Sequence, residues 1–210
     1  MKKLNKVYEK IHASYFGIFG VVIFLIGLIP AIAVHNNFSF LTTFVSDLAV
    51  PGWNDLAIWF SIFWFITGIF MILFILGFTL FLQEKGSSKK STNITCVLGV
   101  VSAIGILMLA LFNTRDADFL HGIAQYVFFF PGILYLFSYA YLEHKLSEFP
   151  LWQALFNVIV AFFFILYLIL FIVNRIDETL LVEAKVVAEW LFLFSNMLWF
   201  VETGIFILRK

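Results

Sequence analysis

Residues 152–173 read WQALFNVIVAFFFILYLILFIV, a run of 22 residues without a charged side chain. A transmembrane helix needs roughly 20 mostly apolar residues to cross about 30 Å of hydrocarbon. A strand of a membrane barrel would instead alternate apolar and polar residues over shorter segments. This stretch therefore predicts a helix that crosses a membrane.

Five further apolar runs of similar length occur along the chain. The expected spans are approximately Tyr15–Val34, Leu56–Leu82, Ile94–Phe112, Leu120–Leu142, Trp152–Val173 and Val186–Leu208. The connections between them are too short to hold a soluble domain, and the sequence contains no convincing internal repeat. We expect one domain over residues 1–210, an all-α integral membrane protein built as a bundle of six transmembrane helices.

The composition excludes several classes of protein. Hydrophobic residues make up 63% of the chain and charged residues 12%, against about 45–50% and about 25% in soluble domains. A soluble globular enzyme, a disordered chain and a disulfide scaffold are therefore excluded, the last because Cys96 is the single cysteine. The net charge of zero gives no indication of a nucleic-acid partner.

Lysine and arginine predict the orientation, because short cytoplasmic loops carry an excess of both. With a cytoplasmic N-terminus, the cytoplasmic segments hold ten of them: Lys2, Lys3, Lys6, Lys10, Lys85, Lys89, Lys90, Lys145, Arg209 and Lys210. The outer loops hold three: Arg115, Arg175 and Lys185. Both termini are therefore expected in the cytoplasm. Ala31-Ile32-Ala33 also resembles a signal-peptide cleavage site, but the six-span charge balance accounts for the sequence without cleavage.

Two carboxylates, Glu189 and Glu202, fall inside the last expected span. Charge at mid-membrane costs about 2.5–3.5 kcal/mol on insertion scales, so each needs a reason. Their separation of 13 residues corresponds to about 20 Å along a helix and places them on different faces. We expect Glu189 near an outer polar pocket, as a functional or a structural group. For Glu202 we expect snorkelling or helix packing.

The remaining polar residues of interest gather at the outer ends of the spans. The candidate ligand-binding residues are Ser46, Asp47, Arg115, Asp116, His121, Gln125, Glu189 and Asn196. Within this set Asp47, His121 and Glu189 are the candidate catalytic groups, because an imidazole beside carboxylates suits acid–base work. The alternative is a structural clasp in which Asp47 bonds backbone donors or His121 and fastens the first loop to the bundle.

No sequence motif specifies a reaction. The chain has no HExxH, GxSxG or Walker motif and no metal-spaced Cys/His pair, so no metal and no cofactor is predicted. His121 begins a span and is equally suited to capping or to an interfacial hydrogen bond. Arg115 stands beside acidic residues, where a salt bridge and a phosphate contact are both open.

Three short motifs resemble those of known six-span families. Val45-Ser46-Asp47-Leu48-Ala49 is similar to the Ser-Asp-x-Gly of DRAM-like proteins, the group that includes the fibroblast-growth-factor-receptor-activating proteins. It is also similar to the Ser-Asp-Leu-Gly of an uncharacterised prokaryotic six-span family. Ala49 stands where both have glycine. Leu120-His121-Gly122-Ile123-Ala124, after Leu111-Phe112-Asn113, resembles the opening of their fourth span, and Ala188-Glu189-Trp190 resembles the Glu-Trp of the DRAM-like last span.

This resemblance implies six helices with cytoplasmic termini and a link to lipid remodelling or lipid organisation. It carries over onto Ser46, Asp47, His121 and Glu189. The main prediction is a non-enzymatic protein that binds or organises membrane lipid, with the headgroup in the outer pocket and acyl chains in the aromatic-lined bundle. A membrane-embedded enzyme acting on a lipid or lipid-linked substrate is one alternative. A small-solute transporter is another, disfavoured by the lack of repeats and of broken helix pairs.

Membrane lipid is the expected partner, and a second copy of the chain or another membrane protein is a further candidate. The expected location is an integral multi-pass membrane position, in the cell membrane if the chain is prokaryotic.

Overall fold

The computed structural model describes residues 8, 11–177 and 179–210, and in this part of the chain the regular structure is helical. Four of the lysines counted toward the orientation, Lys2, Lys3, Lys6 and Lys10, lie outside the described residues. The long helices are α2 (Ala13–Val34), α3 (Ala57–Glu84), α4 (Lys89–Leu111), α5 (Asp118–His144), α6 (Leu151–Ile176) and α7 (Val182–Leu208). All six are long and apolar enough to cross a membrane, which confirms the predicted all-α fold and its six spans.

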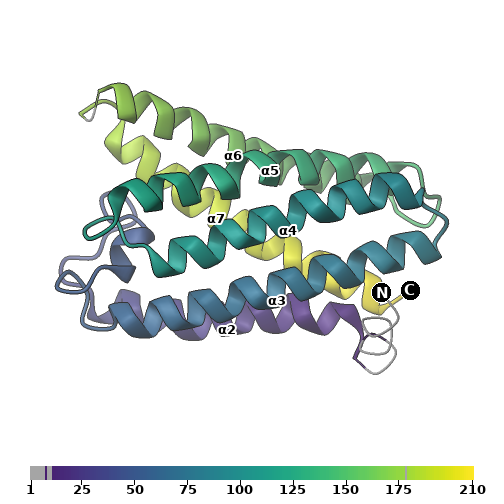
Figure 1. Ribbon diagram of the computed structural model, residues 1–210, viewed down its shortest axis with the longest axis horizontal. Helices are drawn as coiled ribbons and strands as arrows, with labels where there is room; N and C mark the ends of the chain where they lie inside the picture. Colours follow the sequence, from purple (N-terminus) through teal and green to yellow (C-terminus); the bar gives the residue numbers. More distant parts are fainter. Residues whose placement is uncertain (1–7, 9–10, 178) are drawn as a thin grey trace.

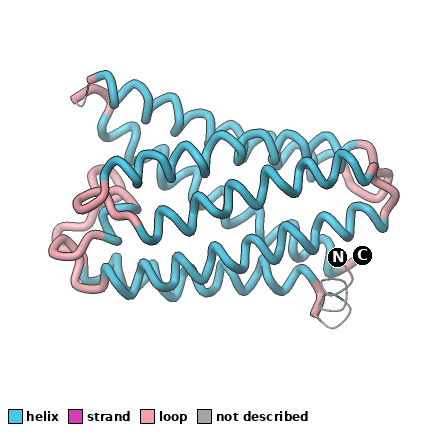
Figure 2. Tube along the Cα trace, in the orientation of Figure 1, coloured by secondary structure: helices cyan, strands magenta, loops and turns pink. Residues whose placement is uncertain are grey.

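The helices form a closed ring in chain order (Figure 1). Each packs against its neighbour in the sequence, and α7 closes the ring against α2. Segments 35–56 and 112–117, with residues 177 and 179–181, lie at one end of the bundle, which we call the three-loop end (Figure 2). Segments 85–88 and 145–150 lie at the opposite, two-loop end, together with the start of α2 and the end of α7.

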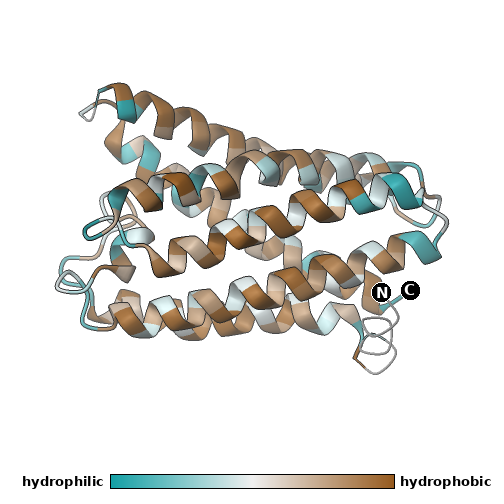
Figure 3. Ribbon diagram, viewed as in Figure 1, coloured by the Kyte–Doolittle hydropathy of each residue, from teal (hydrophilic) through white to brown (hydrophobic). Residues whose placement is uncertain are grey.

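Hydrophobic residues predominate along the six helices, and hydrophilic residues concentrate toward the two ends of the bundle (Figure 3). Among the large hydrophobic residues, Phe119 is 78% exposed and Ile176 is 84% exposed. Such exposure suits a surface that faces lipid, because lipid tails are as apolar as the side chains. The interior is filled by aromatic rings, for example Trp199 stacked on Tyr139 and edge-on to Phe74.

Glycine allows α4 and α5 to approach each other closely. A Cβ atom added at Gly105 would lie 2.5 Å from the backbone nitrogen of Phe128, too near for any other residue. Ser102 Oγ, on the same helix, donates a hydrogen bond of 2.7 Å to the carbonyl oxygen of Phe128. Small residues and interhelical hydrogen bonds of this kind hold membrane helices together, since lipid supplies no hydrophobic drive.

The first loop contains regular structure that the sequence analysis did not assign. Ser46–Ala49 forms a 3-10 helix, η1, whose Ser46, Leu48 and Ala49 are buried. Ala49 lies within this helix and does not adopt a positive φ, so glycine is not required there. The turn falls instead at Gly52, which has a φ of 90° that L side chains rarely adopt.

Candidate functional site

A cavity of about 490 Å³ hollows the three-loop end between the first loop, α5, α6 and α7. We call it the vestibule. Its lining residues are Phe44, Ser46, Asp47, Trp53, Thr114, Asp118, His121, Gln125, Tyr167, Phe171, Asn174, Arg175, Val182 and Lys185.

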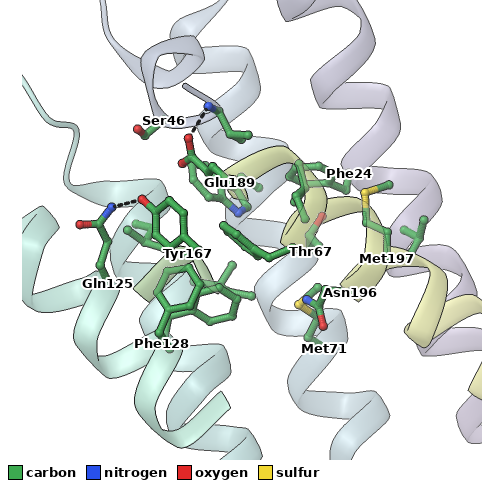
Figure 4. A pocket seen from close by; sticks show the side chains of 18 of the residues that line it. Phe24, Ser46, Thr67, Met71, Gln125, Phe128, Tyr167, Glu189, Asn196 and Met197 are labelled. Atoms are coloured by element: carbon green, nitrogen blue, oxygen red, sulfur yellow. Dashed lines mark hydrogen bonds between the residues drawn. The ribbon is translucent and has the colours of Figure 1, made fainter. Parts of the chain in front are cut away.

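A second cavity of about 30 Å³ lies deeper in the ring and is lined mostly by apolar side chains (Figure 4). Its volume suits about one water molecule. Ser46, His121, Gln125 and Tyr167 line both spaces, so these four side chains form the boundary between the vestibule and this inner cavity.

The last helix fastens the first loop to the bundle. Glu189 Oε2 accepts a hydrogen bond of 3.0 Å from the backbone N–H of Val45, the residue before η1 (Figure 4). Trp190 Nε1 donates to the carbonyl oxygen of Thr43 at 2.9 Å. We call Glu189, Trp190, Thr43 and Val45 the clasp. A carboxylate suits this position because the start of a helix carries unpaired N–H groups.

Asp47 strengthens the loop from within. Its Oδ2 accepts a hydrogen bond of 2.9 Å from the backbone N–H of Phe44. Burial raises the pKa of the Asp47 carboxyl, and the Phe44 N–H, His35 and Lys185 oppose this rise. The carboxyl group also lines the vestibule, so it is at once a structural element of the loop and part of the cavity wall.

Two buried acceptors at the boundary lack a partner. His121 Nδ1 lies 2.6 Å from the carbonyl oxygen of Phe112, which can only accept, so Nδ1 carries the proton. Nε2 of the neutral ring is then an acceptor, and it has no hydrogen-bond partner. Gln125 Nε2 donates to the Tyr167 hydroxyl at 2.9 Å, while its Oε1 is also without a partner (Figure 4).

Two cations lie at the vestibule wall. Lys185 Nζ donates to Asn174 Oδ1 at 2.8 Å and lies 4.9 Å from the centre of the Phe44 ring. Arg175 forms a salt bridge of 3.4 Å with Asp118, and both of these side chains are substantially exposed. Both cations were counted for the orientation, but neither was predicted as a site residue. Lys185 precedes Glu189 by one helical turn, and this spacing could have placed it on the same face.

The structure brings together some of the predicted site residues and separates others. Ser46, Asp47, His121, Gln125 and Glu189 all line the vestibule or the inner cavity, and Asn196 lines the inner cavity farther into the bundle. Arg115 and Asp116 line neither space.

Those two residues organise the loop between α4 and α5. Arg115 Nη1 donates to the carbonyl oxygen of Pro51 at 3.1 Å and so braces the first loop from the other side. Asp116 accepts from Asn113 Nδ2 at 3.0 Å within its own turn. Both residues therefore lie outside the two cavities, Asp116 bonded within its own turn and Arg115 bonded to the first loop.

The three candidate catalytic side chains do not form a hydrogen-bonded set. Asp47 and Glu189 each bond a backbone amide, and His121 bonds a backbone carbonyl. Within the described residues, no group of three His, Cys, Asp or Glu side chains is placed to hold a metal ion. Asp47 bonds a backbone donor and not His121, and this donor belongs to the first loop itself, whereas Glu189 and Trp190 make the bonds from the bundle to that loop.

Comparison with known proteins identifies a family. A family model described as a protein of unknown function (DUF998) matches residues 18–205. The chain belongs to the DUF998 family. The DUF998 match begins inside α2 and ends inside α7, so it includes parts or all of every span. No curated protein and no solved structure matches the chain.

Proposed function

We propose that this multi-pass membrane protein binds the headgroup of a membrane lipid in the vestibule. The observation that carries the proposal is the pair of buried acceptors, His121 Nε2 and Gln125 Oε1, which have no partner and belong to side chains that line the cavity. A buried acceptor left unpaired costs about 1–3 kcal/mol, so a ligand that pairs both gains binding energy there.

The two acceptors select the chemistry of the ligand. Because neither atom donates, the ligand must present donors, which are hydroxyl or ammonium groups. Lys185 and Arg175 at the same wall supply positive charge for an anionic part of the ligand. A lipid phosphate that bears a hydroxyl or amino substituent offers both features in one headgroup.

The surroundings of the vestibule favour a lipid over a free solute. Trp53 lines it and is 48% exposed, as expected for tryptophan at the level of lipid headgroups. Phe119 and Ile176 adjoin Asp118 and Arg175 in the chain, and both are exposed. The headgroup would thus enter beside an apolar surface that its acyl chains can follow.

The acyl chains belong outside the ring. Sequence analysis expected them in the aromatic-lined interior, but the inner cavity of about 30 Å³ has room for a water molecule and not for a hydrocarbon chain. We therefore place them along the lipid-facing sides of α5 and α6. The resemblance to DRAM-like proteins at Ser46-Asp47 and Glu189-Trp190 supports a lipid-organising function, since both motifs adjoin this site.

The test is the lipid that remains with the full chain after purification in a mild detergent. Mass spectrometry should find a defined phospholipid on the native protein and its loss from both His121→Ala and Lys185→Gln. His144→Ala and Lys90→Gln are the matched controls, because both residues are exposed at the two-loop end. Unchanged thermal unfolding of the variants would show that they fold.

Reconstitution into vesicles then tests whether the headgroup must carry a hydrogen-bond donor. Vesicles of phosphatidylcholine alone lack a donor, whereas those containing phosphatidylethanolamine or phosphatidylglycerol supply one. The proposal expects thermal stabilisation by the second kind alone, lost in His121→Ala. The proposal would be overturned if all variants carried the same mixture of bulk lipid and no vesicle raised the thermal stability of the native protein. The vestibule would then be only a space left where the first loop is fastened to α7.

A further inference from the structure

A second polar cluster lies inside the ring, in the half toward the two-loop end. Helix α6 presents two amides one turn apart, Gln153 and Asn157, and each donates to a carboxyl group of a flanking helix. Asn157 Nδ2 lies 2.7 Å from Glu143 Oε2 of α5. Gln153 Nε2 lies 2.5 Å from Glu202 Oε2 of α7. Glu202 was predicted to snorkel or to pack between helices without a carboxyl neighbour, and the predicted fourth span ended at Leu142, before Glu143.

The orientation of Asn157 is fixed by bonds at both ends of its amide. Its Oδ1 accepts from Trp199 Nε1 at 2.6 Å, and its Nδ2 also donates to the carbonyl oxygen of Gln153 at 3.0 Å. The amide nitrogen therefore has to face Glu143, and it makes Glu143 Oε2 an acceptor. Glu143, Gln153 and Asn157 are each fully buried.

No cation of the described residues compensates the two carboxyl groups. Lys85 pairs with Glu148 at 2.9 Å, and Lys145 and Lys210 lie over aromatic rings. Neither Glu143 nor Glu202 takes part in a salt bridge within that part of the chain. An ionised carboxylate that is buried without a cation costs several kcal/mol, whereas a protonated one costs far less.

We infer that Glu143 is a proton-binding site, with its carboxyl group held neutral beside Asn157, in a cluster that holds a second carboxyl group, Glu202. The proton lies on Oε1, because Oε2 already accepts from Asn157. Oε1 is buried and has no partner in the protein, as is Oε1 of Gln153. These two oxygen atoms are a geometric sign of a proton site, separate from any argument about charge. A proton on Glu143 Oε1, together with a water molecule, would give both atoms a hydrogen-bond partner.

Helices α5, α6 and α7 supply the groups that surround Glu143. Helix α6 contributes the Asn157 amide, whose oxygen accepts from Trp199 of α7, and α7 also carries Glu202, a carboxyl group that interacts electrostatically with Glu143. Its own helix contributes Tyr139 one turn earlier, which also interacts with Cys96 of α4. Each titratable group in this set is neutral or acidic, so the surroundings favour proton uptake over ionisation.

Infrared spectroscopy of the full chain in detergent tests this inference, because a protonated carboxyl group has a carbonyl stretch that an ionised one lacks. At pH 7 we expect such a band, shifted in heavy water. Glu143→Gln should remove the part of the band that Glu143 contributes, while the glutamine oxygen keeps the bond from Asn157 and preserves the fold. Glu148→Gln, at an exposed carboxylate, should leave the band unchanged.

Three results would overturn the inference. They are the absence of the band at pH 7, an unchanged band in Glu143→Gln, or the appearance of the band only after sodium is replaced by choline. The last would make the occupant a metal cation. If Glu143→Gln does not fold, Glu143→Asp serves, because the shorter side chain loses the Asn157 bond and should shift the band instead of removing it.

Discussion

Glu189 Oε2 and the backbone N–H of Val45 lie 3.0 Å apart, although 144 residues separate them in the chain. This bond places the carboxylate of the last helix at the start of η1, and both residues line the inner cavity. The loop therefore keeps its shape only while α7 stays packed in the ring.

Glu189→Ala should lower the free energy of unfolding by about 1–3 kcal/mol, because it leaves the buried N–H of Val45 without an acceptor. Glu189→Gln retains an acceptor oxygen and should cost less. Chemical unfolding in detergent measures both. Glu84→Ala, at an exposed residue that ends α3, is the control and should change little. Equal decreases in unfolding free energy in all three variants would show that the bond from Glu189 to Val45 does not stabilise the fold.

Trp190→Phe should remove one hydrogen bond while keeping an aromatic ring in place. The indole nitrogen donates to Thr43, and its ring packs edge-on against Phe38 and Phe40. We expect a loss of about 1 kcal/mol in unfolding free energy and faster proteolysis within the first loop. Trp152→Phe, at a residue 54% exposed, should show neither effect. A first loop that is cleaved no faster in Trp190→Phe would contradict the clasp.

The folded protein should bind more protons than the unfolded chain at Asp47, because burial raises its pKa above the ordinary value of 3.8. Its contribution to stability is then fully present below about pH 3.8 and is lost as the pH rises through the folded pKa. Asp47→Asn should remove this dependence, so its stability relative to the native chain should increase across that window. Unfolding curves of both proteins between pH 3 and pH 7 measure it, and parallel curves would refute it.

Gly105→Ala should destabilise the protein more than Gly99→Ala. A Cβ atom at Gly105 meets the backbone of Phe128, which cannot move without separating α4 from α5. At Gly99 the nearest atom is a methyl group of Ile75, 3.0 Å away, which can rotate aside. Overpacking typically costs about 1–3 kcal/mol, and thermal unfolding of the two variants compares the cost. A larger loss of stability in Gly99→Ala than in Gly105→Ala would contradict this prediction, because it would show that α5 moves away from α4 more easily than the Ile75 side chain rotates.

The six spans were predictable because each depends on a local property, the length of an apolar run. The observed helices extend the predicted ones by a few residues into polar caps, such as Ser88 before α4, whose side chain accepts from Ser91 N–H. Those extensions follow from hydrogen bonding at helix ends, which hydropathy does not measure. Glu143 was missed for this reason, since it lies at the polar end of α5 and is nevertheless fully buried.

The candidate site was predictable in part. His121 and Gln125 were expected on one face from their spacing of four residues, and both line the vestibule. Arg115 and Asp116 were grouped with them because they belong to the same end of the bundle. Asp116 instead bonds Asn113 in its own turn, and Arg115 bonds Pro51 of the first loop. Such hydrogen bonds of loop residues depend on backbone geometry that the residue order does not reveal.

The sequence alone determined that the chain crosses a membrane six times, because burial of an apolar run in lipid needs no knowledge of its neighbours. Only the tertiary structure decided which polar groups meet: Glu189 with Val45 at one end, and Glu143 with Asn157 toward the other. In an apolar solvent each buried polar group must find a partner within the protein. That partner depends on how the six helices close into a ring, and residues far apart in the chain supply it.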